Sequence, residues 1–368
     1  MVESILYVHN PPLGRALTDR LRRRRPLLAC VVAHTDVCEV PGISAAGATP
    51  ELRRYTAAAD LEVLYHGRPR CIPEVPINPL GPPSPVVLTA AALKLSGIAV
   101  RYVSAGLKII PDVPLETLGI EPGRDIRTGR ALVDAAGLFE RGQALGARLA
   151  AEADYLVVGE SVPGGTTTAL ALMLALGLDA NGKVSSSFAE NPLVLKSSLV
   201  AEALAAAWPN GPAAEVDPLL AAQAVGDPMQ PAVAGLALGA LLAGAEAVVL
   251  AGGTQMAAVL ALLAAIEHRA GRDLPADRLA VATTRWVATD PSADLAGLAR
   301  QIGEVPFLAA NLDFSASRHP GLRRYEEFLV KEGVGAGGAA MAAMLATGVG
   351  PTELLAAVDD VYDALLAT

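Results

Sequence analysis

The sequence predicts an α/β protein with a doubly wound, mostly parallel, Rossmann-like sheet and a smaller helical part formed by its terminal segments. Short apolar runs typical of buried strands alternate with helical segments through the middle of the chain, as in successive βαβ units. Of the 368 residues, 52% are hydrophobic but only 4% are aromatic, which favours small-residue helices packed closely on a parallel sheet. We predict a main α/β domain over residues 27–320, with residues 1–26 and 321–368 forming the smaller helical part.

The expected elements follow from apolar periodicity and from helix start and stop signals. Strands are expected at residues 4–8, 27–33, 99–106, 155–158, 245–251, 278–285 and 305–310. Helices are expected at residues 85–96, 134–152, 230–243, 254–270, 291–302, 325–331, 336–347 and 351–367, with another that begins at Thr166–Thr168. Two segments, 69–85 and 111–132, are expected to be irregular, and loops as long as the first are often functional.

Charge and composition exclude several classes of partner. The net charge of −9 argues against nucleic-acid binding. The basic run Arg22–Arg25 is interpreted as a solvated helix end, and the apolar segment after it is too short for a signal peptide. The longest apolar stretch, residues 231–253, is interrupted by Glu246 and predicts a helix, a turn and a strand instead of a membrane span. Three cysteines without metal-type pairing favour a cytoplasmic location, and no metal or cofactor is predicted.

The stretch 154–178 carries the clearest functional signal. A short buried strand feeds a turn rich in Gly and Pro, and three threonines then open an Ala/Leu helix. Such a turn is a ready anion site, because free backbone N–H groups and the helix dipole point at the ligand. Glu160 lies at the carboxyl end of the strand. A carboxylate beside a phosphate cradle suits a site that must also stabilise a positive charge.

A second candidate is KEGVGAGG, residues 331–338. We expect Glu332 to end one helix and the glycine-rich turn to open the next. A Glu at a helix C-terminus has the wrong sign for the dipole, and the glycines permit close approach of backbone to a ligand. The alternative is a simple joint between two helices with an exposed Glu.

Other motifs are weaker. The glycine-rich turn matches neither the Walker loop nor GxGxxG, and Ser161 does not lie in GxSxG. His34 and His319 could be ligands or bases, although isolated histidines are more often structural.

Two motifs carry a family resemblance. GESVPGGTTTALAL resembles GEMGIGNTTAAAA of the nicotinate-nucleotide–dimethylbenzimidazole phosphoribosyltransferases, and KEGVGAGGAA is similar to EGTGAALA near the end of that family. Weaker echoes, GRDIRTGRAL, GDPMQPAVAGLALGA and FSASRHP, occur in the same order, so the resemblance covers roughly residues 120–345. The chain is most similar to a divergent, nicotinate-mononucleotide-dependent branch.

The resemblance implies transfer of the 5-phosphoribosyl group of nicotinate mononucleotide to a benzimidazole-type base, giving α-ribazole 5′-phosphate and nicotinate, by a homodimer. Glu332 would be the base and Glu160 a second carboxylate that orients substrate or stabilises positive charge. The implied substrate-binding residues are Gly164, Gly165, Thr166, Thr167, Ser186, Lys196, Ser315, Gly333 and Gly335. Two other functions stay open, a non-catalytic nucleotide-binding protein and a nicotinamide-dependent oxidoreductase. The missing GxGxxG counts against the oxidoreductase.

Overall fold

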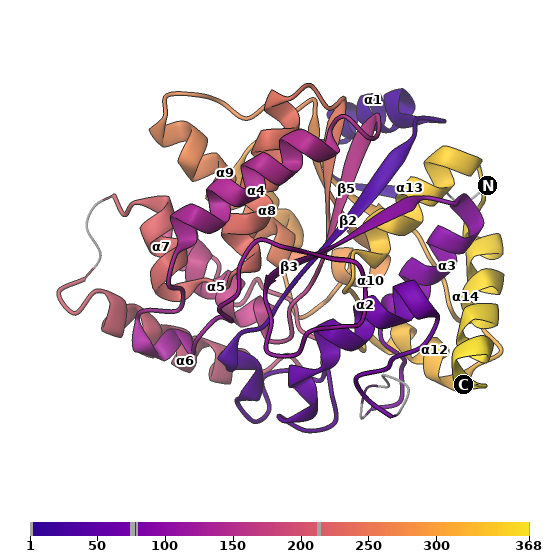
Figure 1. Cartoon of the computed structure of the whole chain (residues 1–368), viewed down its shortest axis with the longest axis horizontal. Coiled ribbons are helices and arrows are strands. Elements are labelled where there is room, and N and C mark those ends of the chain that lie inside the picture. Colours follow the sequence, from indigo (N-terminus) through magenta and orange to yellow (C-terminus); the bar gives the residue numbers. More distant parts are fainter. Residues whose placement is uncertain (1–2, 74–77, 79, 212–214, 368) are drawn as a thin grey trace.

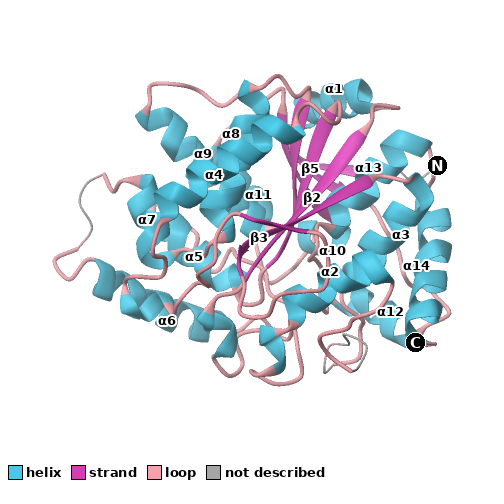
Figure 2. Ribbon diagram, in the orientation of Figure 1, coloured by secondary structure: helices cyan, strands magenta, loops and turns pink. Residues whose placement is uncertain are grey.

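The computed structural model describes residues 3–73, 78, 80–211 and 215–367, which form an α/β structure around one eight-stranded sheet (Figures 1 and 2). The strands are β1 (Ile5–His9), β2 (Pro26–Ala33), β3 (Ala99–Gly106), β4 (Leu115–Thr117), β5 (Tyr155–Ser161), β6 (Ala247–Ala251), β7 (Leu279–Thr284) and β8 (Phe307–Ala310). Their order is β1-β8-β7-β6-β5-β2-β3-β4, and every pairing is parallel except that of β1 with β8. The predicted mostly parallel α/β sheet is confirmed.

Helices cover both faces of the sheet. They are α1 (Pro11–Leu21), α2 (Thr56–His66), α3 (Val86–Ser96), α4 (Ala135–Leu149), α5 (Gly165–Ala175), α6 (Leu193–Ala207), α7 (Pro218–Val225), α8 (Met229–Leu242), α9 (Thr254–Arg269), α10 (Arg285–Ala288), α11 (Leu295–Ile302), α12 (Pro320–Arg323), α13 (Ala336–Thr347) and α14 (Pro351–Leu366). One large apolar core includes α4, α5, α8 and α9, while α2, α3, α13 and α14 pack together on the opposite side (Figure 1). Within the described ranges, none of the helices has the length and apolar character that a membrane span requires.

Small residues explain how α4 and α8 pack. A Cβ atom added at Gly142 or Gly146 of α4 would overlap with backbone atoms of α8. The same holds for Gly235 and Gly239 of α8 against α4. The two helices therefore meet backbone to backbone, which a core poor in aromatic residues permits.

Two expectations about secondary structure are wrong. The segment 111–132, expected to be irregular, contains β4, which pairs with β3 at the edge of the sheet. The helix expected at residues 325–331 is only a 3₁₀ turn, Arg324–Glu327. Val330 and Lys331 have φ values of 69° and 65°, which a right-handed helix does not permit. Of the segment 69–85, residues 74–77 and 79 lie outside the described residues, and the others are mostly irregular.

The terminal segments also add one strand to the sheet and one helix that packs against it. β1 adds an antiparallel edge strand, and α13 packs against β5, β6, β7 and β8. The division into a main domain at 27–320 and a terminal helical part stays a prediction.

Candidate functional site

A cavity of about 330 Å³ opens at the carboxyl ends of the central parallel strands. The loops that follow β5, β6 and β2 line it, together with the segment that precedes α13. This is the end of an open α/β sheet where ligands bind. Among the predicted site residues, those that line the cavity are Glu160, Gly164, Gly165, Thr166, Ser186, Glu332 and Gly333.

Glu332 faces the cavity from an irregular loop, so the expectation that it ends a helix is wrong. One carboxylate oxygen accepts hydrogen bonds from the hydroxyl and the backbone N–H of two β7 threonines, Thr283 Oγ1 and Thr284 N, at 2.9 Å each. The other oxygen accepts 3.2 Å hydrogen bonds from two backbone N–H groups, that of Gly333 in the loop and that of Gly337 in the first turn of α13. Withdrawal from bulk water raises the pKa of Glu332 to about 7, although these four bonds favour the ionised form.

Glu160 is the penultimate residue of β5 and is only 2% exposed. Its carboxylate accepts a hydrogen bond from Val162 N at 3.2 Å. Burial raises the pKa of Glu160 well above its ordinary value, and the negative charges of Glu332 and Asp227 add to the shift. Among the residues that the structure describes, no Lys or Arg forms an ion pair with either cavity glutamate. The cavity is therefore suited to a cationic ligand.

The glycine-rich turn has the geometry of an anion site at the start of α5. Gly164 has a φ of 79°, which favours glycine. The N–H groups of Gly165 and Thr167 bond to Val162 O and Gly164 O, whereas no acceptor in the described ranges takes the N–H of Gly164 or Thr166. Two N–H groups are thus left for a ligand beside the positive end of the helix dipole.

Behind the turn, a buried carboxyl holds the first turn of α5 in place. Asp227, which is fully buried, accepts a 2.5 Å hydrogen bond from the hydroxyl of Thr168 and a 3.1 Å bond from Met229 N. Burial raises the pKa of Asp227 to about 6. Asp227 does not line the cavity.

A buried ionic network lies under the serines at 185–187. Lys331 and Asp290, whose side chains are each 1% exposed, form an ion pair at 2.9 Å. Burial alone would raise the pKa of Asp290, but a 2.6 Å hydrogen bond from the Ser185 hydroxyl and the charge of Lys331 outweigh it, so the pKa lies below its ordinary value. Burial and the charge of Lys331 lower the pKa of Lys196 to about 7, and its Nζ donates to Ser185 O at 2.6 Å. Lys196 therefore supports the wall of the cavity without lining it.

Three other predicted residues also lie outside the lining. The Thr167 side chain is buried within α5, and Gly335 packs against Gly159 so closely that a Cβ atom on Gly335 would lie 2.7 Å from Gly159 Cα. Ser315 is an exposed residue whose backbone N–H donates a 2.8 Å hydrogen bond to the carboxylate of Asp313. The structure therefore does not bring Ser315 to the cavity.

One carboxyl of the cavity, that of Asp60, carries no recognisable signal in the sequence. Asp60 on α2 accepts hydrogen bonds from the hydroxyls of Ser84 and Ser161, at 2.8 and 2.7 Å. Burial raises the pKa of Asp60 to about 6. No short-range motif could have found it, because Asp60 and Ser161 are 101 residues apart and meet only through the packing of α2 on β5.

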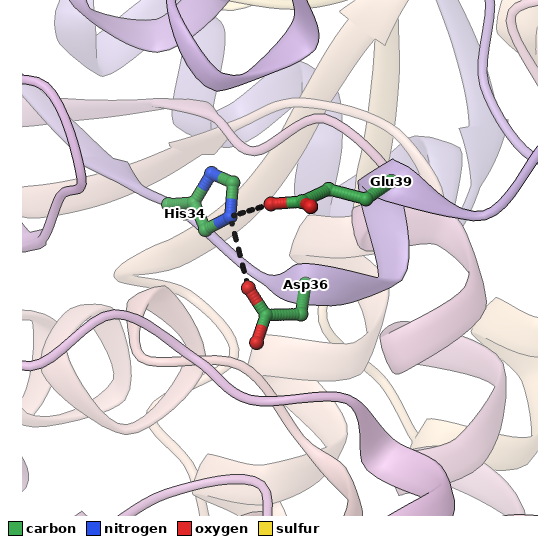
Figure 3. A group of neighbouring side chains, drawn as sticks. All are labelled: His34, Asp36 and Glu39. Atoms are coloured by element: carbon green, nitrogen blue, oxygen red, sulfur yellow. Dashed lines mark hydrogen bonds and ion pairs between the residues drawn. The ribbon is translucent and has the colours of Figure 1, made fainter. Parts of the chain in front are cut away.

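The structure also groups His34, Asp36 and Glu39, whose potential ligand atoms lie within 4.8 Å of one another although their spacing in the sequence is not that of a metal site (Figure 3). Lys108 pairs with both carboxylates, at 2.7 Å from Glu39. Burial and the charge of Lys108 lower the pKa of His34. The ammonium group of Lys108 already provides a cation for these two carboxylates, which favours a structural role for the three residues.

His319 is not part of this group of three residues. Its Nε2 lies 3.0 Å from Asp363 of α14, and its ring packs edge-on against Tyr362. These contacts favour a structural role for His319 as well.

Two curated proteins are similar to this chain over most of its length. The chain is 49% identical over 367 residues to a UPF0284 protein of Gloeobacter violaceus, covering 99% of this chain and 94% of that protein. It is 44% identical over 325 residues to a UPF0284 protein of Methanothermobacter thermautotrophicus, covering 88% of each. No protein-family model matches the chain.

Two solved structures from Thermus thermophilus share the fold. A nicotinate-nucleotide–dimethylbenzimidazole phosphoribosyltransferase superposes with a TM-score of 0.60 at 20% identity, covering 97% of this chain and 92% of that one. A CobT structure superposes with a TM-score of 0.62 at 20% identity, covering 96% and 90%. The resemblance found in the sequence is thus confirmed for the fold, and the extensive identity to the curated relatives shows that the chain belongs to the UPF0284 family.

Proposed function

We propose that this protein transfers the 5-phosphoribosyl group of nicotinate mononucleotide to a benzimidazole-type base, giving α-ribazole 5′-phosphate and nicotinate. One observation carries the proposal. Glu160 and Glu332, from distant parts of the chain, enter one cavity beside a turn with two free N–H groups. A ligand with a phosphate at one end and a cationic ring at the other matches this arrangement.

The proposed reaction needs one base. The bond between C1′ of the ribose and the pyridinium nitrogen breaks, and the electron pair leaves with nicotinate. A nitrogen of the azole attacks C1′ from the opposite face, which inverts the configuration, and the azole N–H proton passes to Glu332. A carboxyl with a pKa of about 7 is well matched to this task near neutral pH.

Glu160 would stabilise the positive charge. The bound pyridinium is cationic, and positive charge grows on the ribose as its bond to the ring breaks. A cation in the cavity opposes the effects that raise the pKa of Glu160, so binding of the nucleotide favours its ionised form.

The turn after β5 would hold the 5′-phosphate. The free N–H groups of Gly164 and Thr166 would donate to the phosphate at the start of α5, with Ser186 and Gly333 as further contacts. Thr167, Lys196 and Gly335 would act through packing, because they lie behind the lining. Ser315 has no part in this proposal.

Incubation with nicotinate mononucleotide and a panel of azole bases, followed by mass spectrometry, tests the proposal. We expect free nicotinate and a new ribotide in equal amounts. Nucleotide binding without nicotinate release, whichever base is added, would instead support a non-catalytic nucleotide-binding protein. A change in nicotinamide absorbance with a hydroxy acid would support an oxidoreductase.

We also propose that the protein is a cytoplasmic homodimer. Light scattering at working concentration tests the dimer, and a monomeric mass would contradict it.

A further inference from the structure

The carboxyl of Asp60 is the third that faces the cavity. Asp60 is 2% exposed, and the hydrogen bonds from Ser84 and Ser161 reach different oxygens of its carboxyl group. In the described part of the chain, no lysine or arginine pairs with it. Asp60, Ser84 and Ser161 all line the cavity, and we call this set the acceptor wall.

The hydrogen bonds of the acceptor wall fix what it can offer to a ligand. A serine hydroxyl has one proton and two lone pairs. Ser84 and Ser161 both donate their protons to ionised Asp60, and Ser84 Oγ also accepts a bond from Val86 N at 3.4 Å. Only the remaining oxygen lone pairs are left for the cavity. The acceptor wall can therefore bind an N–H or O–H group. An apolar or acceptor group placed against it would leave the lone pairs of the wall unpaired.

The acceptor wall lies beside the segment that carries Glu332. A Cβ atom on Gly333 would lie 3.4 Å from the ring of Pro85, which is next to Ser84. The hydroxyl of Thr89 on α3 donates to Val334 O at 3.1 Å. A base whose ring N–H reaches Glu332 thus has the acceptor wall along its side.

We propose that Asp60, through Ser84 and Ser161, selects bases that carry a second hydrogen-bond donor, a hydroxyl or amino group on the ring, over bases of similar size without one. This inference rests on the proposed function, in which Glu332 takes the first N–H of the same base. Its physical basis is the cost of leaving buried acceptors unpaired, which discriminates more strongly than a difference in apolar contact.

A matched pair of bases tests the selection. The probes are 5-hydroxybenzimidazole and 5-methylbenzimidazole, whose substituents are of similar size, and only the hydroxyl is a hydrogen-bond donor. Calorimetry gives the affinity of each base, with and without nicotinate mononucleotide, and mass spectrometry gives kcat/KM. We expect wild type to favour the hydroxy base by at least about tenfold. In Asp60→Asn the amide donates to one serine and frees that serine's proton, so the preference should fall to within about threefold.

Two further variants serve as a second test and a control. Ser161→Ala removes one acceptor without changing a charge and should weaken the preference even if Asp60→Asn fails to fold. Asp359→Asn alters another buried aspartate that accepts a serine hydroxyl, that of Ser317 at 2.5 Å, outside the cavity. It should retain the full preference.

The outcomes separate this inference from the proposed function. If no base is turned over but the hydroxy base still binds at least about tenfold more tightly in an Asp60-dependent way, the proposed reaction fails and the selection stands. Equal affinity and equal kcat/KM for the two bases in wild type overturn the inference. So does a preference that Asp60→Asn and Ser161→Ala both leave unchanged.

Discussion

The backbone N–H of Val334 donates a 2.6 Å hydrogen bond to the carbonyl oxygen of Glu160. This bond joins the end of β5 to the loop before α13. Next to it, Gly159 and Gly335 face each other so closely that a Cβ atom on either would lie within about 3 Å of the other's Cα. The carboxyls of Glu160 and Glu332 are therefore held by one backbone junction, and their relative position does not depend on side-chain contacts alone.

The first prediction concerns Glu332→Gln. We expect turnover to fall by at least about a hundredfold, as for loss of a general base. Nicotinate mononucleotide should still bind, and the fold should be kept. The melting temperature should decrease slightly, because the amide NH₂ must face an N–H group of Thr284 or α13. Steady-state kinetics, calorimetry and circular dichroism measure these three effects.

Glu327→Gln is the control for this substitution, since Glu327 is an exposed carboxylate outside the cavity. It should leave turnover unchanged. Near-normal turnover in Glu332→Gln would show that another group takes the proton.

The second prediction concerns pH and stability. The folded-state pKa of Glu160 is raised above its ordinary value, so the folded state binds its proton more tightly than the unfolded state. The resulting stability is present below about pH 4 and is lost as pH rises through the raised pKa. Glu160→Gln lacks this titration. Its melting temperature should therefore fall less than that of wild type between pH 5 and pH 8, in thermal scans without ligand.

Other groups titrate in the same window, including Asp60, Asp227 and Glu332 with raised pKa values and His34 with a lowered one. They are common to both proteins, so the difference between the two profiles reports the titration of Glu160 together with its coupling to Glu332 and Asp227. Parallel profiles would show that burial does not raise the pKa of Glu160.

The third prediction concerns Gly165 at the start of α5. A Cβ atom there would overlap with the side-chain oxygen of Gln255, so Gly165→Ala should displace Gln255 and weaken nucleotide binding. Gly165→Asp adds a charge near the phosphate. Repulsion at about 4 Å is on the order of 4 kcal/mol at an effective dielectric constant of about 20. Calorimetry with nicotinate mononucleotide should give the tightest binding for wild type, weaker binding for Ala and no detectable binding for Asp.

Gly165→Asn separates charge from size, because it has the shape of Asp without the charge. We expect it to bind measurably. If Asp and Asn bound equally, the phosphate would have to lie elsewhere in the cavity.

The fourth prediction concerns the buried pair of Asp290 and Lys331. Asp290→Asn leaves the ammonium of Lys331 without its anion in a site that is 1% exposed. The free energy of unfolding should fall by about 3 kcal/mol. Denaturant titration measures the fall. As a control, Asp19→Asn removes the partner of Arg22 at the surface, where the side chains are 72% and 61% exposed, and should have no measurable effect. Equal stability of Asp290→Asn and wild type would contradict the prediction.

The sequence predicts the sheet and much of the cavity for identifiable reasons. Buried parallel strands leave continuous apolar runs such as Tyr155–Val158, and their carboxyl ends must share one edge of the sheet. This rule brings Glu160 and the turn at Gly164 to the cavity. The glycine-rich stretch KEGVGAGG marks Glu332, far away in the chain, as a candidate, and the family resemblance gives it the role of the base.

What the sequence does not predict depends on tertiary contacts. Residues 325–331 have helical spacing, but Lys331 must reach Asp290 and Glu332 must reach Thr284, and these contacts impose left-handed backbone conformations at Val330 and Lys331. Asp60 carries no motif, because its partners come from the ends of other elements. Propensity describes neighbours in the chain and cannot report such contacts.

The antiparallel edge of the sheet has a consequence for synthesis. Ile5 of β1 pairs with Ala310 of β8, so β1 finds its partner only after about 300 further residues have been added. Ribosomes add roughly 5–20 residues per second, so β1 stays unpaired for about 15 s or longer while the central strands can already assemble. During that interval its free edge can bind chaperones or other nascent chains. Completion of this sheet is therefore a late event on the ribosome.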